Sequence, residues 1–132
     1  MMRLLVDTSA YSAQMRGHRE IAEASRLADE LVMTPIVLGE LVSGFLRGKH
    51  RAANRTGLDQ FLVSSRVSVV SITEATADRY AIILDALRRV GRPVPTNDLW
   101  IAASAMEHGL AVLTTDADFI RIDQIVVRHF DP

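Results

Sequence analysis

Short runs of apolar residues alternate along the chain with longer segments in which apolar residues recur at helical spacing. The runs predict buried strands, and they are Arg3–Val6, Val67–Ile72, Leu110–Thr114 and Ile125–Arg128. The second run is rich in β-branched residues, which favour strands. Strands that alternate with helices are typical of an α/β fold with a mostly parallel sheet.

The helical spacing predicts helices between these runs, at His18–Glu30, Ile36–Arg47, Leu58–Ser64, Thr73–Val90 and Thr96–His108. Thr34 and Pro35 are typical cap and first-turn residues for the second helix. Gly109 is placed to end the last helix. The first strand ends in Asp-Thr-Ser, which indicates a turn. Since no linker, repeat or low-complexity segment interrupts the pattern, we expect residues 1–132 to form one domain.

The composition removes several classes of protein from consideration. The 132 residues are 48% hydrophobic and 23% charged, as in ordinary globular proteins. The chain has no cysteine, which excludes disulfides, a thiol nucleophile and a zinc ribbon. Its start, MMRLLVDTS, reaches an aspartate too early for a signal peptide, and no apolar run suits a membrane span. We therefore expect a soluble cytoplasmic protein, and the net charge of −1 argues against binding nucleic acid through a global field.

Four acidic residues fall where an open parallel sheet binds its ligands. Asp7 and Asp116 follow predicted strands, and Asp98 lies in the first turn of a helix. Each also fits a plain structural role in a turn or a helix cap. Glu40 lies on a mostly apolar helix, where it is either solvated on an exposed stripe or paired with Arg47 or a metal.

Taken together, the four acids favour a hard divalent cation. Clustered carboxylates repel each other, and Mg²⁺ or Mn²⁺ removes that penalty. The four histidines are scattered and lack the spacing of zinc ligands. A magnesium-type site activates a water and holds a phosphodiester for in-line attack.

Four segments around these acids, in this order, resemble the acidic motifs of the PIN-domain family: Leu4–Ala10, Pro35–Leu41, Pro95–Ala103 and Leu113–Phe119. The chain length and the form Asn-Asp-Leu-Trp-Ile-Ala-Ala resemble the VapC toxins of bacterial type II toxin–antitoxin pairs. The resemblance spans essentially the whole chain, and no acidic position departs from the pattern.

The resemblance implies a three-layer α/β/α sandwich and a Mg²⁺-dependent endoribonuclease, with Mn²⁺ as the other candidate metal. It also implies a homodimer that a VapB-type antitoxin neutralises. Asp7 and Asp98 match the principal metal ligands, and Glu40 and Asp116 match the two further catalytic acids that position metal, water or substrate. The residues that match supporting roles are Asp118, a variable extra acid, and Thr8, Ser9 and Thr114, which assist by hydrogen bonding.

The densest basic stretch offers candidate contacts to RNA or to an antitoxin, through Arg47, Lys49, Arg51 and Arg55. Solvated helix faces are the alternative interpretation of these cations. Trp100 lies two residues after Asp98, so we expect it to point away from that acid, into the core or an interface.

Rival functions fit the residues less well. A phosphoaspartyl phosphatase needs a second aspartate where this chain has Ser9, and a receiver domain needs a lysine near the acids, whereas Lys49 lies in the basic stretch. An RNA-binding or antitoxin-sequestering module with little hydrolysis of its own remains the main alternative.

Overall fold

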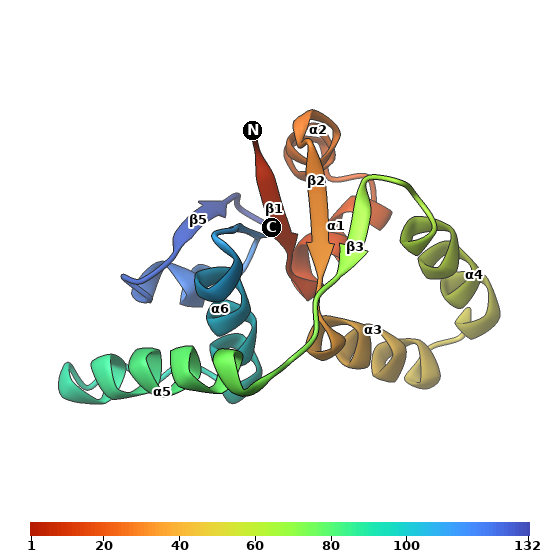
Figure 1. Cartoon of the computed structure of the whole chain (residues 1–132). Coiled ribbons are helices and arrows are strands. Elements are labelled where there is room, and N and C mark those ends of the chain that lie inside the picture. The colour runs from red at the N-terminus through yellow and green to blue at the C-terminus, as the bar shows by residue number, and fades with distance from the viewer.

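The computed structural model describes residues 1–132 and contains a five-stranded parallel sheet with strand order β3-β2-β1-β4-β5 (Figure 1). The strands are β1 (Arg3–Val6), β2 (Glu30–Met33), β3 (Val67–Val69), β4 (Ala111–Thr114) and β5 (Val126–His129). All strands run in one direction, so their carboxyl ends meet at the same edge of the sheet.

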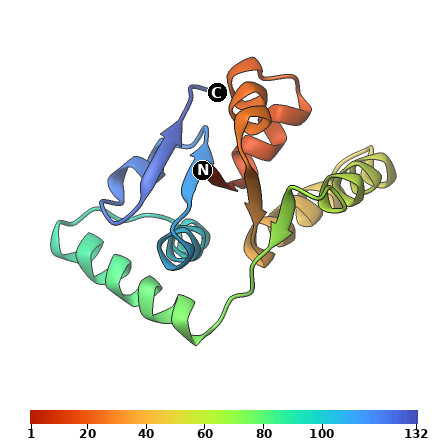
Figure 2. The ribbon, with the colours of Figure 1, turned by 45° about the horizontal axis from the view of Figure 1, so that its top comes forward.

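Helices cover both faces of this sheet. They are α1 (Thr8–Met15), α2 (Arg19–Leu27), α3 (Pro35–Arg47), α4 (Arg51–Leu62), α5 (Glu74–Arg89) and α6 (Thr96–His108), followed by the 3₁₀ turn η1 (Ala117–Arg121). In Figure 2, α1 and α2 lie on one side of the sheet and α5 and α6 on the other, while α3 and α4 extend beyond β3. The predicted three-layer α/β/α sandwich is therefore confirmed.

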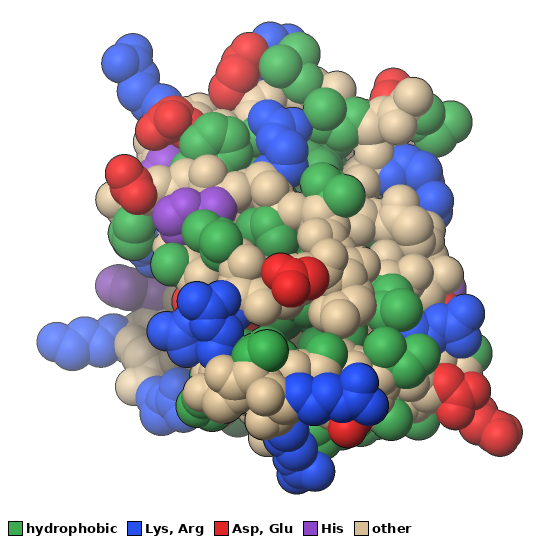
Figure 3. Space-filling view, turned by 90° about the vertical axis from the view of Figure 1, so that its left-hand side faces the viewer, with side chains coloured by type: hydrophobic (Ala, Val, Ile, Leu, Met, Phe, Trp, Pro, Cys, Tyr) green, Lys and Arg blue, Asp and Glu red, His purple; other side chains and the backbone are tan.

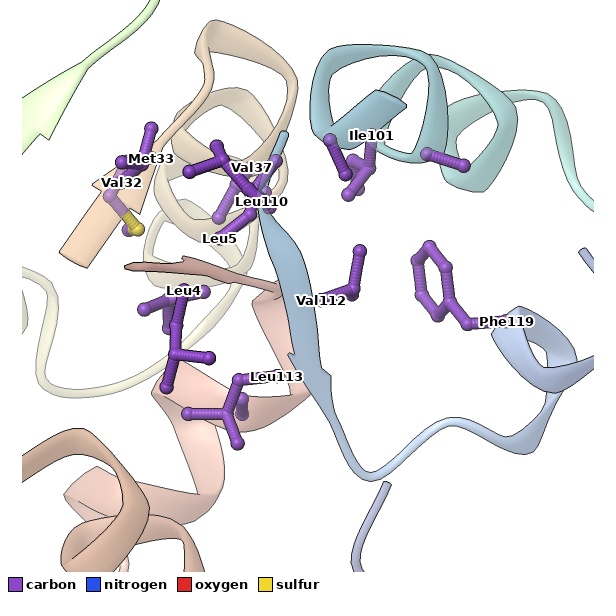
Figure 4. Close-up of a cluster of buried hydrophobic side chains, with 14 of the residues drawn as sticks. Leu4, Leu5, Val32, Met33, Val37, Ile101, Leu110, Val112, Leu113 and Phe119 are labelled. Atoms are coloured by element: carbon purple, nitrogen blue, oxygen red, sulfur yellow. The ribbon is translucent and has the colours of Figure 1, made fainter. Parts of the chain in front are cut away.

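The central strands are buried on both faces, as a parallel sheet requires. Leu4 and Leu113 point toward α1, whereas Leu5 and Val112 point toward the side of Ile101 on α6 (Figure 4). These side chains belong to one hydrophobic core of 27 buried residues. The two predicted runs that form the central strands β1 and β4 therefore pack between two helical layers, whereas the runs that form the edge strands β3 and β5 are partly exposed.

Local signals in the sequence position the two helices that carry acids. The Thr34 hydroxyl accepts a hydrogen bond from the Val37 amide at 3.2 Å, and Pro35 occupies the first turn, so α3 begins immediately after β2. Helix α6 ends at Gly109, whose φ of 65° is left-handed and suits glycine. Both predicted helix boundaries are confirmed.

Two elements escaped the sequence pattern. Thr8–Met15 forms α1, where a turn was predicted. Glu30–Met33 forms β2, whereas the pattern extended the preceding helix to Glu30 and placed Leu31 on its apolar stripe. The helix ends at Leu27 because Ala28 adopts an extended conformation, and Leu31 then faces the core from a strand.

Three further boundaries differ. Helix α4 begins at Arg51 instead of Leu58, because the basic stretch is itself helical. Strand β3 ends at Val69 instead of Ile72, since Val69 pairs with Met33, the last residue of β2. Helix α5 begins at Glu74, with Thr73 as its cap in a capping box with Thr76.

On the face formed by β5 and the end of α5 (Figure 3), no large patch of a single type of side chain is visible. Figure 3 shows acidic, basic and hydrophobic side chains interspersed there, with Lys and Arg gathered toward the part where α5 lies. Every helix is too short or too polar to cross a membrane.

Candidate active site

The acids singled out in the sequence converge at the carboxyl edge of the sheet. Asp7 is the residue between β1 and α1, and Asp116 lies between β4 and η1. Asp98 occupies the first turn of α6, and Glu40 lies in the second turn of α3. The charges of Asp7, Asp116, Glu40 and Asp118 all act on Asp98, so the five carboxylates form one electrostatic cluster.

Three of these carboxylates are close enough to share one metal ion. Asp98, Asp116 and Asp118 each offer an oxygen, and these oxygens lie within 4.8 Å of one another. An all-oxygen set of carboxylates is the kind of donor that Mg²⁺ and Mn²⁺ prefer. The residues present therefore fit a hard divalent cation, and Asp118, which was predicted as a supporting acid, lies among them.

Crowding has a measurable consequence for Asp98. This side chain is only 8% exposed. Burial, followed by the negative charges of Asp7 and Asp116, raises the pKa of Asp98 to about 7. A bound divalent cation would reverse this effect, because it compensates the repulsion among the ionised carboxylates.

Asp7 is buried deeper and is held by hydroxyl groups. Its Oδ2 accepts hydrogen bonds from Ser9 Oγ at 2.6 Å and from Thr114 Oγ1 at 2.8 Å. Burial raises the pKa of Asp7, and the bonds from Ser9 and Thr114 oppose that rise. The hydroxyls thus fix the direction of the carboxylate and reduce the cost of ionising it.

Ser9 and Thr114 also connect Asp7 to the loop that carries Asp116. Thr114 Oγ1 accepts from the Asp116 amide at 2.8 Å, and Ser9 Oγ accepts from the Thr115 amide at 3.0 Å. The Asp118 amide in turn donates to Asp116 Oδ1 at 2.9 Å. This network joins the ends of β1 and β4, so the predicted supporting residues lie directly beside the acids.

Glu40 is held at both of its carboxylate oxygens. Thr8 Oγ1 donates to Oε1 at 2.6 Å, and Asn97 Nδ2 donates to Oε2 at 3.3 Å. Helices α1, α3 and α6 therefore meet at this one side chain. Of the partners considered for Glu40 from sequence, Arg47 is not the one found, since its guanidinium donates to Ser43 Oγ instead.

Asn97 is the residue at this site that the sequence argument missed. Its position next to Asp98 in the first turn of α6 was the available signal. Only the fold reveals that this turn faces α3 closely enough for the amide to reach Glu40.

The predicted basic contacts are all exposed, and they lie on α3, α4 and the segment between them. Arg55 pairs with Asp59 at 3.0 Å within α4, which leaves Arg47, Lys49 and Arg51 without an acidic partner. Trp100 points away from the acids, as expected, and stacks on Tyr80 of α5 at 4.2 Å between ring centroids.

Comparison with known protein families matches residues 4–125 to the PIN domain. That span contains all four motifs on which the resemblance rests. Among curated proteins, Ribonuclease VapC4 of Mycobacterium tuberculosis is 35% identical over 92 residues, which cover 70% of this chain and 71% of that protein.

Solved structures agree with the fold. VapBC2 from Rickettsia felis, bound to a DNA fragment from its promoter, superposes with a TM-score of 0.87 at 24% identity, over 98% of this chain and 100% of that chain. DNA-bound VapBC from Salmonella typhimurium superposes with a TM-score of 0.85 at 26% identity, over 98% of both chains.

Proposed function

The chain belongs to the PIN domain family, and on this premise we propose that it is a divalent-metal-dependent endoribonuclease, the toxin of a VapBC-type toxin–antitoxin pair. The observation that carries the proposal is the convergence of five carboxylates at the carboxyl edge of the sheet. Such a cluster is unfavourable by itself because its carboxylates repel each other. A metal-dependent hydrolase needs such a cluster to bind its cation. The named ribonuclease relatives favour RNA as the substrate.

In this proposal Asp98, Asp116 and Asp118 would hold the cation, and Asp7 lies near enough for its charge to act on Asp98. The ion is Mg²⁺ or Mn²⁺, because all the donors are carboxylate oxygens. When bound, it supplies Lewis acidity to a phosphodiester and to the attacking water.

The protein's own groups prepare and orient this chemistry. Asp98, whose pKa is raised to about 7, would have to be ionised to serve as a ligand. Ser9 and Thr114 keep the Asp7 carboxylate ionised and aimed. Glu40, fixed by Thr8 and Asn97, orients the attacking water at the mouth of the site. Since the site has no serine–histidine or cysteine pair, hydrolysis proceeds without a covalent intermediate on the protein.

A VapB-type antitoxin is the partner that neutralises this activity. The support comes from the solved neighbours, which are VapBC complexes. We further propose that the toxin is a homodimer and that residues 1–132 work as one nuclease unit.

The test is cleavage of single-stranded RNA by the purified protein, with Mg²⁺, with Mn²⁺ and with EDTA. We expect cleavage only with metal, and a loss of roughly a hundredfold or more in Asp98→Asn and Asp116→Asn. Asp123→Asn is the matched control, because Asp123 is an exposed acid outside the cluster. Activity in EDTA, or full activity in both site variants, would reject the mechanism.

The same experiment distinguishes the main alternative. Binding of RNA by the wild-type protein without any product, on every RNA offered and with either metal, would favour a sequestering module over a nuclease.

A further inference from the structure

A shallow hollow of about 350 Å³ adjoins the acids on the side of Glu40. Its lining comes from the first three turns of α3 and from the start of α6, and consists of Pro35, Ile36, Gly39, Glu40, Ser43 and Asn97. Since Glu40 is shared by the hollow and by the acidic cluster, a molecule in the hollow would touch the site where hydrolysis takes place. No role proposed so far uses this space.

The lining offers hydrogen-bond groups with a defined orientation. The Glu40 carboxylate can only accept, so Asn97 must present its Nδ2 there and keep Oδ1 as a free acceptor. Ser43 adds a hydroxyl, and Pro35 and Ile36 add apolar surface. This mixture of amide, hydroxyl and apolar surface suits a nucleoside, which is recognised through its edges and its flat faces.

Gly39 keeps the hollow open. A Cβ added at Gly39 would meet no other atom within 4 Å, so the space above it is empty. Glycine in the interior of a helix costs about 1 kcal/mol relative to alanine, and no left-handed backbone angle requires it at this position. The chain thus keeps an unfavourable residue where a larger one would fold at least as well and would fill the hollow.

A cation follows the hollow along the same face of α3. Glu40, Ser43 and Arg47 lie at helical spacing, and Arg47 donates to Ser43 Oγ at 3.3 Å. The seven steps from Glu40 to Arg47 span roughly 10 Å of helix. The order along this face is therefore the acidic cluster, the polar hollow and the exposed guanidinium. With a divalent cation held by the cluster, this order would complement a phosphate, its nucleoside and the next phosphate.

We propose that this hollow is the subsite for the nucleoside that flanks the scissile phosphate of single-stranded RNA, and that Arg47 binds the phosphate beyond it. The inference rests on the proposed nuclease function and adds the place of the substrate chain to it.

The test fills the hollow with Gly39→Leu and uses Gly57→Leu on α4 as its matched control. Both glycines are helical with no atom within 4 Å of an added Cβ, but only Gly39 lines the hollow. We measure thermal unfolding, cleavage of ten-nucleotide single-stranded RNAs with product mapping, and binding of the same RNAs in EDTA by fluorescence anisotropy. Both variants should fold. Gly39→Leu should raise KM and weaken binding in EDTA by about tenfold with a changed cleavage-site preference, whereas Gly57→Leu should match wild type.

Arg47→Gln tests the second half of the proposal. The slope of log affinity against log salt concentration is negative, and Arg47→Gln should reduce its magnitude by about 0.7. The cleavage-site preference should stay the same. Arg26→Gln is its control, because Arg26 lies on α2, outside the basic stretch, and is paired with Glu23 at 2.7 Å.

Each outcome decides the matter. If wild type cleaves RNA and Gly39→Leu retains wild-type KM, EDTA binding and site preference, the subsite is wrong although the nuclease function stands. Equal losses in Gly39→Leu and Gly57→Leu, or an unchanged salt slope in Arg47→Gln, also overturn it. If wild type cleaves no RNA, the nuclease function fails, and the EDTA binding of the two glycine variants still decides whether the hollow contacts RNA.

Discussion

Asp98 shows how a single side chain can be costly to the fold and useful to the site. It is nearly buried, and the other four carboxylates of the cluster are near enough to oppose its ionisation. In the metal-free protein the favourable state of Asp98 near neutral pH is therefore partly protonated. The cluster is destabilising unless a cation binds, which couples folding to metal binding.

This coupling makes a prediction about pH. The pKa of Asp98 rises from 3.8 in the unfolded chain to about 7 in the fold, so the folded state holds a proton that the unfolded state loses. Without metal, the free energy of unfolding should therefore fall as pH rises from about 4 to about 7, by at most roughly 4 kcal/mol in total. Asp98→Asn cannot ionise and should lose much of this slope, which urea unfolding in EDTA at several pH values measures.

Asp123→Asn should keep the wild-type slope, because Asp123 is exposed and outside the cluster. A metal-free wild type whose stability stays level across this pH range would contradict the assigned burial and crowding of Asp98.

Thr114 carries a second prediction at the scale of one residue. Its buried hydroxyl donates to Asp7 and accepts from the Asp116 amide. Thr114→Val keeps the shape but removes one of the two hydroxyl hydrogen bonds to the buried Asp7 carboxylate and leaves the Asp116 amide without its partner, so we expect a loss of about 2 kcal/mol in the free energy of unfolding. Thr115→Val is the neighbouring control, since no hydrogen bond to the Thr115 hydroxyl is found. Equal losses in the two variants, measured by urea unfolding, would show that the hydroxyl network is not what stabilises this loop.

At the scale of elements, the sequence predicted the helices and strands that have a strong hydrophobic periodicity and missed those in which the periodicity is weak. Helix α3 has a cap, a proline and an apolar run, and its boundaries agree closely with the structure. Helix α1 has only Ala10, Tyr11 and Ala13 buried, with little contrast between its faces, so its pattern resembles a turn after Asp7. Its helical state comes from packing against α2, α3 and β4, which no local pattern reveals.

Strand β2 was not predicted because the helical pattern that precedes it is strong and continues into it. Ile21, Ala24 and Ala28 continue to Leu31 at helical spacing, so the stripe has no visible end. The break is set by Arg66, which donates to the carbonyls of Ser25 and Ala28 at 3.3 and 2.6 Å and so completes the end of α2. A partner 38 residues away in the chain cannot be read from a local pattern.

Helix α2 offers a prediction about caps. His18 Nδ1 accepts from the Ile21 amide at 3.2 Å, and Nε2 lies 2.7 Å from the Asp131 carbonyl oxygen, to which it donates. His50 holds the equivalent cap position of α4 without a side-chain bond. His18→Ala should lower the free energy of unfolding by about 1 kcal/mol, and His50→Ala should change it little. Thermal and urea unfolding of both variants checks this, and similar effects in the two would argue against a capping role for His18.

At the scale of the whole molecule, the topology explains why the four acids could be grouped from sequence. Parallel strands β1 and β4 are neighbours, with Val6 paired to Leu113, so the residues that follow them must meet. The crossovers then return α3 and α6 to the same edge. Which carboxylates lie closest together depends on side-chain conformation. For that reason the closeness of Asp118 to Asp98 and Asp116, and the contact of Asn97 with Glu40, became visible only in the fold.

The same topology predicts how metal acts on the whole fold. Asp98 belongs to α6, while Asp116 and Asp118 belong to the segment after β4, so a cation bound by all three connects two elements that the chain joins only through Gly109 and β4. Binding to the folded state alone should raise the free energy of unfolding by about 2.7 kcal/mol at a Mg²⁺ concentration one hundred times Kd. Asp118→Asn should remove most of this gain, whereas Asp123→Asn should retain it. The measurement is urea unfolding at pH 8 across a Mg²⁺ titration, with isothermal calorimetry for Kd. A full gain in Asp118→Asn would exclude Asp118 as a ligand and would move the ion toward Asp7, whose carboxylate Ser9 and Thr114 already hold in place.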